Sequence, residues 1–564
     1  MRATVTLLSA LLVMAMLLAG CGAATEVVAP TQAPTSPPPE APTAEPTALA
    51  TGVPVPTEVP TVALEPTQSA PVIKRGGVLK IGFEADATDL DPATSSAAAD
   101  TNIQDLVYEG LVKWNPETME LEPLLAKSWE ISPDGLTYTF HLQEGVKWQN
   151  GDPFVAEDVK FSVDRILDPN LGSTRASVLS SIQSVEVVDE LTVVFALKEP
   201  YAPLLSSAPW TPKIQQRKFV EENAGKTPRV MMGTGPFMLK EWVPDQVIHL
   251  VKNPNYWRSG ADGEPLPYLD GLDLLISPDE TARVADFLSG VSDMILSVPN
   301  KDVATLLENP SVVMAGPESM WYSGLFFNVS APPFDNKLVR QAVSWAIDRK
   351  EIAEVGIFGQ VDPIAGGPFP DWHWAGGGPQ VYDHRDLEKA KVLLADAGYP
   401  GGSGFPEVTI LAGAPYQDEI TIAEMTAAYL QELGISAKAE PQEWGTLLDN
   451  LMNKRYTVIA LGWASAVGDP DEVYQSQFHS AGAFNVSGLN DPELDKVLDQ
   501  ARSVSDVAER SRLYHEAEKI LLDDVPQAFV ILHREYQALQ PFVTGFVHMP
   551  TANITTLAET WLDK

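Results

Sequence analysis

The amino-acid sequence predicts an α/β protein behind an N-terminal segment that does not belong to the folded body. Strand-like and helix-like patterns alternate through the C-terminal half of the chain, which is typical of an α/β domain. The chain has 564 residues, of which 45% are hydrophobic, enough for several packed domains. Its composition changes near residue 75, before which proline and threonine are abundant.

The N-terminus has the pattern of a secretion signal. Arg2 precedes a mostly apolar run from Leu7 to Leu18, which is too short to span a bilayer comfortably. Ala19-Gly20 and the single cysteine, Cys21, follow, and Leu18 to Cys21 resembles the bacterial lipobox. We therefore expect residues 1–20 to be a signal peptide and Cys21 to carry the lipid that holds the protein on the membrane. A plain secretory signal or an uncleaved anchor is the alternative.

Residues 21–75 are predicted to be a disordered tether. From Gly22 to Ile73 the chain is largely Pro, Thr, Ala, Val and Glu, with no Lys or Arg. Such a composition buries too little apolar surface to offset the entropy of ordering, and proline keeps the chain partly extended. The alternative, a proline-rich ligand for a partner, lacks a basic residue beside a PxxP core.

The body, residues 76–564, begins with a mixture of strands and helices. Leu79 to Phe83 predicts a strand, and Asp100 begins a helix whose apolar face includes Leu106 and Leu111. Turn residues then predict two hairpins and an intervening helix. These are the run Leu136 to Leu142 after the turn Ser132 to Gly135, the strands Val185 to Val188 and Leu191 to Leu197 joined at Asp189-Glu190, and a helix from Val155 to Ile166.

The later part of the body alternates helix and strand. Ile422 to Leu433 predicts a helix with Gly434 as its C-terminal cap. The other expected elements are strands at Ile435 to Glu440, Tyr456 to Leu461 and Gln527 to Leu532, and helices at Glu493 to Ser503 and Val507 to Leu522.

The charge of the chain argues against several partners. Its net charge of −38 is spread along the sequence without an acidic tail. Such a surface repels nucleic acid and anionic lipid, so we expect neither as a partner and expect contact with the membrane through the lipid anchor only. With Cys21 committed to lipid, no disulfide is expected.

Catalytic motifs are missing from the sequence. It contains no Walker loop, G-x-S-x-G elbow, H-E-x-x-H helix or dinucleotide fingerprint, and Gly233-Thr234-Gly235 continues with a proline. The eight histidines are scattered, so no metal and no cofactor is expected. Asp469 and Asp471 flank a proline and could do acid/base work, although a solvated acidic turn is the simpler interpretation.

Many short segments in order resemble one family, the solute-binding proteins of family 5, which serve oligopeptide, dipeptide and nickel ABC importers. The resemblance covers essentially everything after the tether. Its segments are Leu90 to Pro92, Tyr108 to Val112, Leu124 to Trp129, Ser132 to Phe140, Gly145 to Trp148, Asn150-Gly151, Gly233 to Phe237, Asn253 to Trp257, Phe327-Asn328, Val339 to Ala342, Ala346 to Arg349 and Ala390 to Tyr399.

The resemblance implies a two-lobed periplasmic-binding-protein-like fold, type II and of the large cluster C type, with an inserted subdomain. Lobe 1 would comprise 76–111, 230–320 and 525–564, the inserted subdomain 112–229, and lobe 2 321–524. A ligand between the lobes favours closure only by the affinity that it gains in the closed state. The implied partners are a membrane permease and an ATPase, and the body is expected to be monomeric.

The resemblance also suggests ligand contacts. In peptide-binding relatives a loop after Leu-Asp-Pro pairs with the peptide backbone, and here the loop Thr94 to Ala99 would contribute Ser96 and Ala98. The other half of such a site follows a Gly-Trp pair, which implies Trp463 and Ala464. Peptide binders usually place an aspartate three residues after that Trp, where this chain has Ala466. A ligand ammonium would then need Asp469 or Asp471.

Aromatic residues keep other cargoes open. Trp321, Tyr322, Trp372 and Trp374 are further candidate ligand contacts, because aromatic faces stack on sugar rings, and Asn328 of the motif Phe327-Asn328 joins them. Each of these aromatics could equally belong to the core or to a hinge. We rank a peptide first, a sugar or other organic solute second and a nickel chelate third. A lipid-anchored hydrolase, or a receptor without a transporter, is the alternative of a different class.

Overall fold

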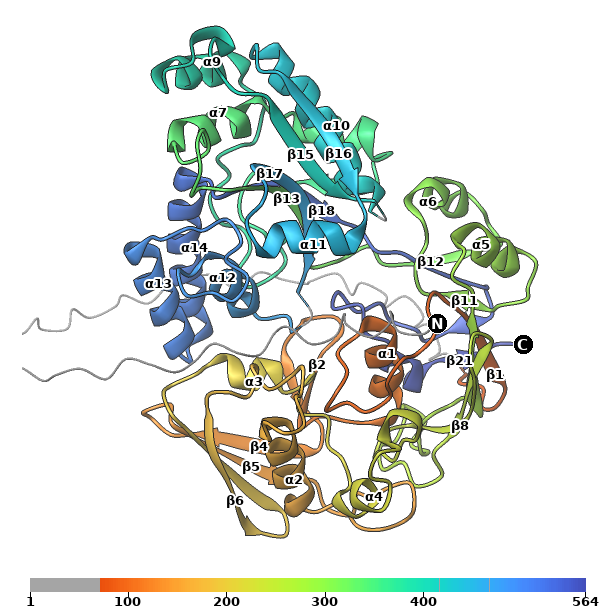
Figure 1. The fold of residues 1–564 in the computed structure, drawn as a ribbon. Helices are drawn as coiled ribbons and strands as arrows, with labels where there is room; N and C mark the ends of the chain where they lie inside the picture. The colour runs from red at the N-terminus through yellow and green to blue at the C-terminus, as the bar shows by residue number, and fades with distance from the viewer. Residues whose placement is uncertain (1–71, 415, 466) are drawn as a thin grey trace, which may run out of the picture. The chain divides into compact units, whose positions relative to one another are not determined.

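The computed structural model describes residues 72–564 except 415 and 466, and these residues belong to one compact unit. The predictions on the signal peptide, Cys21, most of the tether and Ala466 lie outside the described residues. Two large sheets and a smaller one organise the body (Figure 1). Among the described residues, no helix combines the length and the apolar character that crossing a bilayer requires.

The first sheet has seven strands and draws on three separate parts of the chain. In its centre β1 (Val78–Phe83) pairs in parallel with β10 and with β11, so the strand expected at 79–83 is confirmed. The order of strands is β12 (Val313–Ala315), β19 (Gln537–Leu539), β11 (Met294–Ile295), β1, β10 (Gly271–Ile276), β9 (Val247–Lys252) and β8 (Phe237–Val243). The helices near it are α1 (Ala98–Val107), α5 (Glu280–Leu288) and α6 (Asn300–Leu307). We call this part lobe 1.

Helix α1 is shorter than expected. It ends at Val107, and Tyr108 is extended, so Leu111 lies outside the helix, which corrects the predicted face. The helix ends here because of Glu109, the residue after Tyr108. Its buried carboxylate accepts hydrogen bonds from the Thr234 hydroxyl and from the Tyr256 and Trp257 side chains. Three of the segments that carry the family resemblance therefore converge on one buried carboxylate, where they stabilise the fold.

A four-stranded sheet forms the core of the inserted region. Its order is β4 (Ala126–Ile131), β5 (Thr137–Leu142), β7 (Thr192–Leu197) and β6 (Ile182–Asp189), with α2 (Ala156–Leu167) beside it. Both predicted hairpins and the predicted helix are confirmed. They could be predicted because the turn residues that set them are local in the sequence. The short elements here are β2 (Val112–Trp114), β3 (Leu121–Pro123), α3 (Pro203–Ser207), α4 (Arg217–Glu222) and the 3₁₀ turn Thr227–Arg229.

Buried ion pairs fasten the inserted subdomain to lobe 1. Arg165 holds the buried carboxylate of Asp91 in a bidentate pair at 2.7 and 2.6 Å. Lys213 and Asp105 form a second pair at 2.6 Å, with both side chains 5% exposed. The fully buried Arg175 donates to the Ser95 carbonyl and to other groups around it. Separating the inserted subdomain from lobe 1 would leave these buried charges without their partners, which is costly.

The other large sheet has six strands, and we call this part lobe 2. Its order is β14 (Val361–Pro363), β18 (Gln527–His533), β13 (Trp321–Phe327), β17 (Val458–Ala464), β15 (Val408–Gly413) and β16 (Ala437–Gln442). Helices on and beside it are α7 (Lys337–Ala346), α8 (Arg349–Glu351), α9 (Leu387–Asp396), α10 (Gln417–Glu432), α11 (Trp444–Met452), α12 (Pro470–Phe478), α13 (Pro492–Ser503) and α14 (Val507–Asp524), with short turns at Ile352–Gly356 and Pro400–Gly402. Together they enclose the largest apolar core of the molecule.

The expected helices and strands of lobe 2 are confirmed with two differences. Helix α10 begins at Gln417, five residues before the apolar pattern starts at Ile422, because its first turn carries Asp418 and Glu419, which favour a helix N-terminus. Strand β18 lies in the six-stranded sheet, so the boundary expected at 524/525 is too early and lobe 2 continues to His533. The other expected boundaries stay predictions.

Two short segments connect the lobes. Residues 316–320 lead from β12 to β13, and residues 534–536 lead from β18 to β19. The segments touch, because a Cβ on Gly316 would lie 2.1 Å from the Glu535 carbonyl oxygen, and Gly316 has a φ of +113°. Only glycine fits this crossing without strain. The remaining elements are a pair of two-residue strands, β20 (Val543–Thr544) and β21 (Trp561–Leu562), and the 3₁₀ turn Thr555–Glu559.

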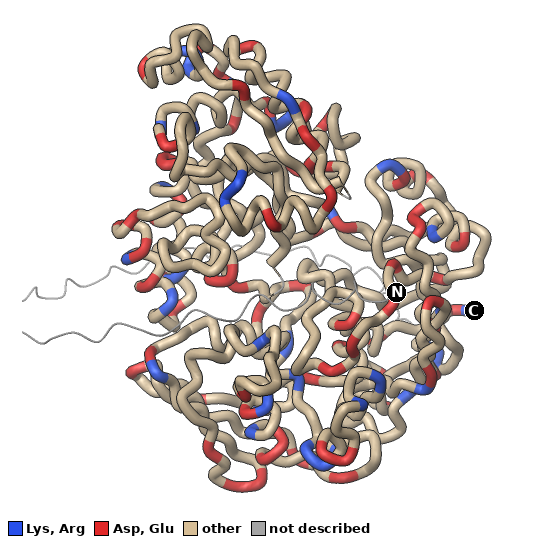
Figure 2. The backbone as a smooth tube through the Cα atoms, viewed as in Figure 1, with Lys and Arg blue, Asp and Glu red and all other residues tan. Residues whose placement is uncertain are grey.

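Charged residues of both signs are distributed over the whole of the described chain (Figure 2). Acidic and basic residues both occur in the two lobes and in the inserted subdomain, and the acidic ones are more numerous. The excess of acid expected from a net charge of −38 is therefore spread over the molecule, as the sequence suggested.

Candidate functional site

The loop before α1 exposes main chain. The Asp100 carboxylate fixes its two ends, accepting hydrogen bonds from the Thr88 amide at 2.7 Å and from the Ser95 hydroxyl at 2.5 Å. Ser96 and Ala98, which lie between Ser95 and Asp100, are exposed. No described residue provides a hydrogen-bond partner for the amide or the carbonyl of Ser96. The two residues named from the sequence therefore form an exposed small-residue surface, in which Ser96 has free backbone groups and Ala98 begins α1.

The end of β17 also offers unpaired main chain. Strand β13 pairs with β17 along its whole length, but on the opposite side β15 pairs only at Val458 and Ile459. Gly462 to Ala464 consequently extend past β15 with one edge free among the described residues. An extended segment could add to this edge by main-chain hydrogen bonds.

Trp463 carries an unused donor at this edge. Its ring packs against the partly exposed Phe484, with centroids 5.0 Å apart and planes at 66°. Its indole Nε1 is buried and has no hydrogen-bond partner in the described residues. An unpaired buried donor costs free energy, and a group that accepts from it would recover that cost.

Polar side chains gather opposite Gly462. A Cβ at that position would lie 2.5 Å from Trp321 Nε1, 2.6 Å from Ser323 Oγ and 2.7 Å from Glu419 Oε1. The Ser323 hydroxyl bonds to Glu419 at 3.0 Å and to His533 Nε2 at 2.7 Å. The His533 ring in turn stacks on Trp321, with centroids 4.0 Å apart. Sequence reasoning found Trp321 but missed Glu419 and His533, since no local pattern links residues so distant in the chain.

Ser323, His533 and Asp418 have the arrangement of a nucleophile, a base and an acid. His533 Nδ1 lies 3.5 Å from Asp418 Oδ2, and Nε2 contacts the serine oxygen. A hydrolase would need that oxygen to reach a carbonyl carbon. Ser323 is fully buried between strands, and Glu419 is a second partner for its hydroxyl. Ser323, Glu419 and His533 therefore form a buried structural hydrogen-bond network, with Asp418 beside the histidine and no access for a substrate.

Two carboxyls near the crossing segments have no hydrogen-bond partner among the described residues, those of Glu84 and Glu535. Glu84 follows β1, and Glu535 lies two residues after His533. Burial raises the pKa of Glu535 to about 7, an effect that His533 opposes and the Glu84 charge reinforces. Burial also raises the pKa of Glu84, although this side chain is accessible to solvent. Glu535 is thus a poorly solvated carboxyl without a hydrogen-bond partner, whereas Glu84 faces solvent and feels the positive charge of Arg283. A cationic group could bind beside them.

Asp469 and Asp471 are already paired. Asp469 caps α12 and receives both terminal nitrogens of Arg510, at 2.8 and 2.6 Å. Asp471 receives Arg502 at 3.0 and 2.9 Å. Both aspartates are at least 95% buried. A ligand ammonium would have to displace an arginine from either one, so the structure gives this pair another role.

The remaining candidates lie in the core or on the surface. The Tyr322 hydroxyl, fully buried, donates to Gln477, and Asn328 donates to the Lys454 and Tyr456 carbonyls. Trp374 is partly buried against Tyr514, whereas Trp372 is exposed. Between these two tryptophans, burial lowers the pKa of His373 to about 4, so this ring stays neutral. Their roles as ligand contacts remain predictions.

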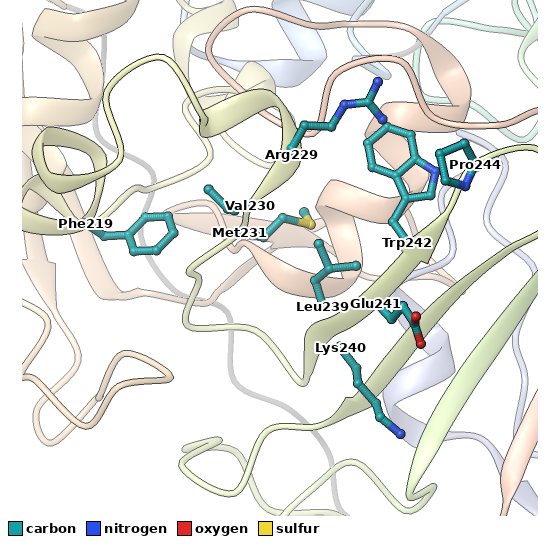
Figure 3. A pocket seen from close by; sticks show the side chains of 9 residues that line it. All are labelled: Phe219, Arg229, Val230, Met231, Leu239, Lys240, Glu241, Trp242 and Pro244. Carbon is teal, nitrogen blue, oxygen red and sulfur yellow. The ribbon is translucent and has the colours of Figure 1, made fainter.

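One hollow lies apart from all these residues (Figure 3). It is open, measures about 650 Å³ and lies beside β8, the edge strand of lobe 1. The Arg229 guanidinium covers the Trp242 ring at 3.9 Å, and Phe219 and Met231 contribute apolar surface. Within the described residues no group of three or more His, Cys, Asp or Glu side chains is placed to hold a metal ion.

Comparison with known proteins decides the family. Residues 120–485 match the family described as bacterial extracellular solute-binding proteins, family 5 middle. The chain belongs to this family. Heme-binding protein A of Haemophilus influenzae is 32% identical over 474 residues, which cover 79% of this chain and 85% of that protein. Glutathione-binding protein GsiB of Escherichia coli is 28% identical over 476 residues, covering 82% and 90%.

Solved structures agree with this family 5 assignment. The periplasmic binding protein DppA from Helicobacter pylori, in complex with the peptide STSA, is similar with a TM-score of 0.72 and 28% identity, covering 87% of this chain and 99% of that chain. HbpA2 from Haemophilus parasuis is similar with a TM-score of 0.75 and 28% identity, covering 86% and 100%. The two-lobed α/β fold is confirmed. As a family 5 protein, the chain is the solute-binding component of an ABC importer, works outside the cytoplasm and is not an enzyme.

Proposed function

We propose that this family 5 protein is anchored to the membrane through lipid on Cys21 and captures peptides, which it delivers to its permease. The free edge of β17 from Gly462 to Ala464 is the observation that carries the peptide proposal. The exposed backbone at Ser96 and Ala98 supports it. Main-chain hydrogen bonds hold an extended peptide without selecting its side chains, which suits an importer of varied peptides.

Two of the relatives favour peptides. DppA was solved with a tetrapeptide, and GsiB is named for glutathione, itself a small peptide. Heme-binding protein A shows that the family also takes another organic solute, which keeps that cargo as the alternative. Trp321, Trp463 and Trp372 would stack on such a planar or cyclic ligand.

A peptide ammonium needs a carboxylate, and we assign it to Glu535 and Glu84 in place of Asp469 and Asp471. Neither glutamate carboxyl has a hydrogen-bond partner among the described residues, whereas both aspartates hold arginines. Glu535 also lies two residues after His533 in the chain. The His533 ring stacks on Trp321, and Trp321 pairs with Ala464 at the β17 edge. Binding an ammonium would remove the cost that burial places on these charges.

Isothermal titration tests the proposal. We expect tri- and tetrapeptides to bind, and Glu535→Gln to weaken peptides with a free amino terminus by tenfold or more while N-acetylated peptides lose little. Glu424→Gln, an exposed residue of α10, is the control. Equal losses for free and acetylated peptides would remove Glu535 from the site, and binding of oligosaccharides or heme in place of peptides would refute the peptide cargo.

A further inference from the structure

The inserted subdomain contacts lobe 2 through α3. The Ser206 hydroxyl, on α3, donates to Asp469 Oδ2 at 2.5 Å, and both side chains are buried. The Ala202 amide, just before α3, donates to the Arg502 carbonyl at 2.9 Å. The Arg502 guanidinium also lies over the Tyr201 ring, 5.3 Å from its centroid. Tyr201, Ala202 and Ser206 of the inserted subdomain thus contact the loop and the helices that follow β17 in lobe 2.

Lobe 2 presents a prepared acceptor for this contact. Asp469 and Arg510 both belong to lobe 2, so their bidentate pair exists whether or not the lobes touch. Burial opposes the charge of Asp469, but Arg510 and the Ser206 hydroxyl together lower its pKa below the ordinary value. The acceptor is therefore a charged oxygen held in a fixed position, and a hydrogen bond to such an oxygen is stronger than one between neutral groups.

The donor side is equally fixed. The inserted subdomain is fastened to lobe 1 by Arg165 with Asp91 and by Lys213 with Asp105. Movement of lobe 2 about the crossing segments must therefore break the contacts of Ser206 and Ala202 together. Asn300 of lobe 1 also donates a hydrogen bond to Asp418 of lobe 2, at 3.0 Å.

We propose that Ser206, Ala202, Asp469 and Arg502 form an interlobe latch that stabilises the contact between the lobes independently of the bound solute. Because the latch contains none of the groups to which we assign the peptide, it raises the population of the arrangement in which the lobes touch by the same factor for every cargo. It would thus set the overall affinity, whereas the residues along β17 would set the specificity. Asp469, which sequence reasoning considered as a partner of a ligand ammonium, thereby acquires a role in closure.

Hydrogen exchange at the Ala202 amide measures the latch without any ligand. The full-length, ligand-free protein is labelled in deuterated buffer, and the label is localised to single residues by fragmentation in the mass spectrometer. Each opening of the lobes frees this amide, so its protection reports the opening equilibrium. The Ile214 amide, which donates to the Glu109 carbonyl at 2.9 Å between the inserted subdomain and lobe 1, is the internal reference.

Ser206→Ala should reduce the protection of Ala202 about tenfold, the usual scale for losing one hydrogen bond to a charged group, and leave Ile214 unchanged. Ser207→Ala is the matched control, because this neighbouring hydroxyl donates only to the Pro203 carbonyl of its own helix. Equal protection of Ala202 in the two variants would overturn the latch. So would an equal loss at Ile214, which would show a loosened subdomain. Since no peptide is used, the latch and the peptide proposal can fail separately.

Discussion

Replacing Glu518 by Gln should remove a pH dependence that is built into lobe 2. Glu518 lies on α14 with 1% of its surface exposed. The Tyr474 hydroxyl donates to Oε1 at 2.7 Å, while Oε2 has no partner among the described residues. Burial raises the pKa of this carboxyl from 4.5 to about 7, against smaller opposing effects from Tyr474 and His515. The folded protein therefore holds a proton that the unfolded chain releases.

The difference in the pKa of Glu518 between the folded and the unfolded chain sets the sign and the size of the pH dependence of stability. Between pH 4.5 and pH 7 the folded state binds more protons than the unfolded state, so the stability from this group is complete below pH 4.5 and is lost as the pH rises through 7. The loss is about 3 kcal/mol, from a shift of roughly two and a half units at about 1.36 kcal/mol each. Glutamine keeps the shape and the acceptor for Tyr474 without the charge, so it should abolish this loss.

Scanning calorimetry of both proteins from pH 4.5 to pH 8 measures the effect. The melting temperature of the Gln variant relative to the wild type should rise by about 6 °C or more across this range, at about 2 °C or more per kcal/mol for a lobe of this size. Glu516→Gln is the control, because Glu516 is exposed on the same helix and pairs with Arg512 at the surface. Parallel melting curves for wild type and Glu518→Gln at every pH would refute the reasoning.

Three further changes test other parts of the structure. Gly462→Ala should lower the free energy of unfolding by about 1–3 kcal/mol, because the new Cβ would crowd three polar atoms. Gly445→Ala is the control, because the nearest atom to its Cβ would be 3.2 Å away, and equal melting temperatures of the two variants would contradict the crowding. Arg165→Met leaves the buried Asp91 charge unpaired and should cost about 3–5 kcal/mol in unfolding, so an unchanged denaturation midpoint would show that the pair does not fasten the subdomain. Cys21→Ser should release the protein from membranes after a salt wash, and retention in the membrane fraction would disprove the lipid anchor.

Local signals allowed much of the fold to be predicted from the sequence. The turn Ser132 to Gly135 fixes its hairpin, and Gly434, with a φ of +82°, ends its helix as expected. Predictions failed where distant residues decide the structure. Helix α1 stops at Val107 because Glu109 is engaged by side chains 125 to 148 residues away. Strand β18 pairs with β13 across the whole of lobe 2, which no local pattern reveals.

The candidate site was predictable to a smaller extent. Trp463, Ala464, Ser96 and Ala98 came from the family resemblance, and their exposed backbone agrees with a peptide contact without testing it. The network of Ser323 and His533 joins residues 210 positions apart, so spacing could not show it. Asp469 and Asp471 look like free acids in a loop, but arginines 41 and 31 positions later occupy them.

Affinity capture tests the central claim that this chain binds peptides by their main chain. The purified protein is immobilised and exposed to a proteolytic digest and to an oligosaccharide mixture, and the retained molecules are identified by mass spectrometry. We predict enrichment of short peptides with varied side chains over a heat-denatured control of the same protein. Retention of sugars alone, or no enrichment of peptides over the denatured control, would contradict the account.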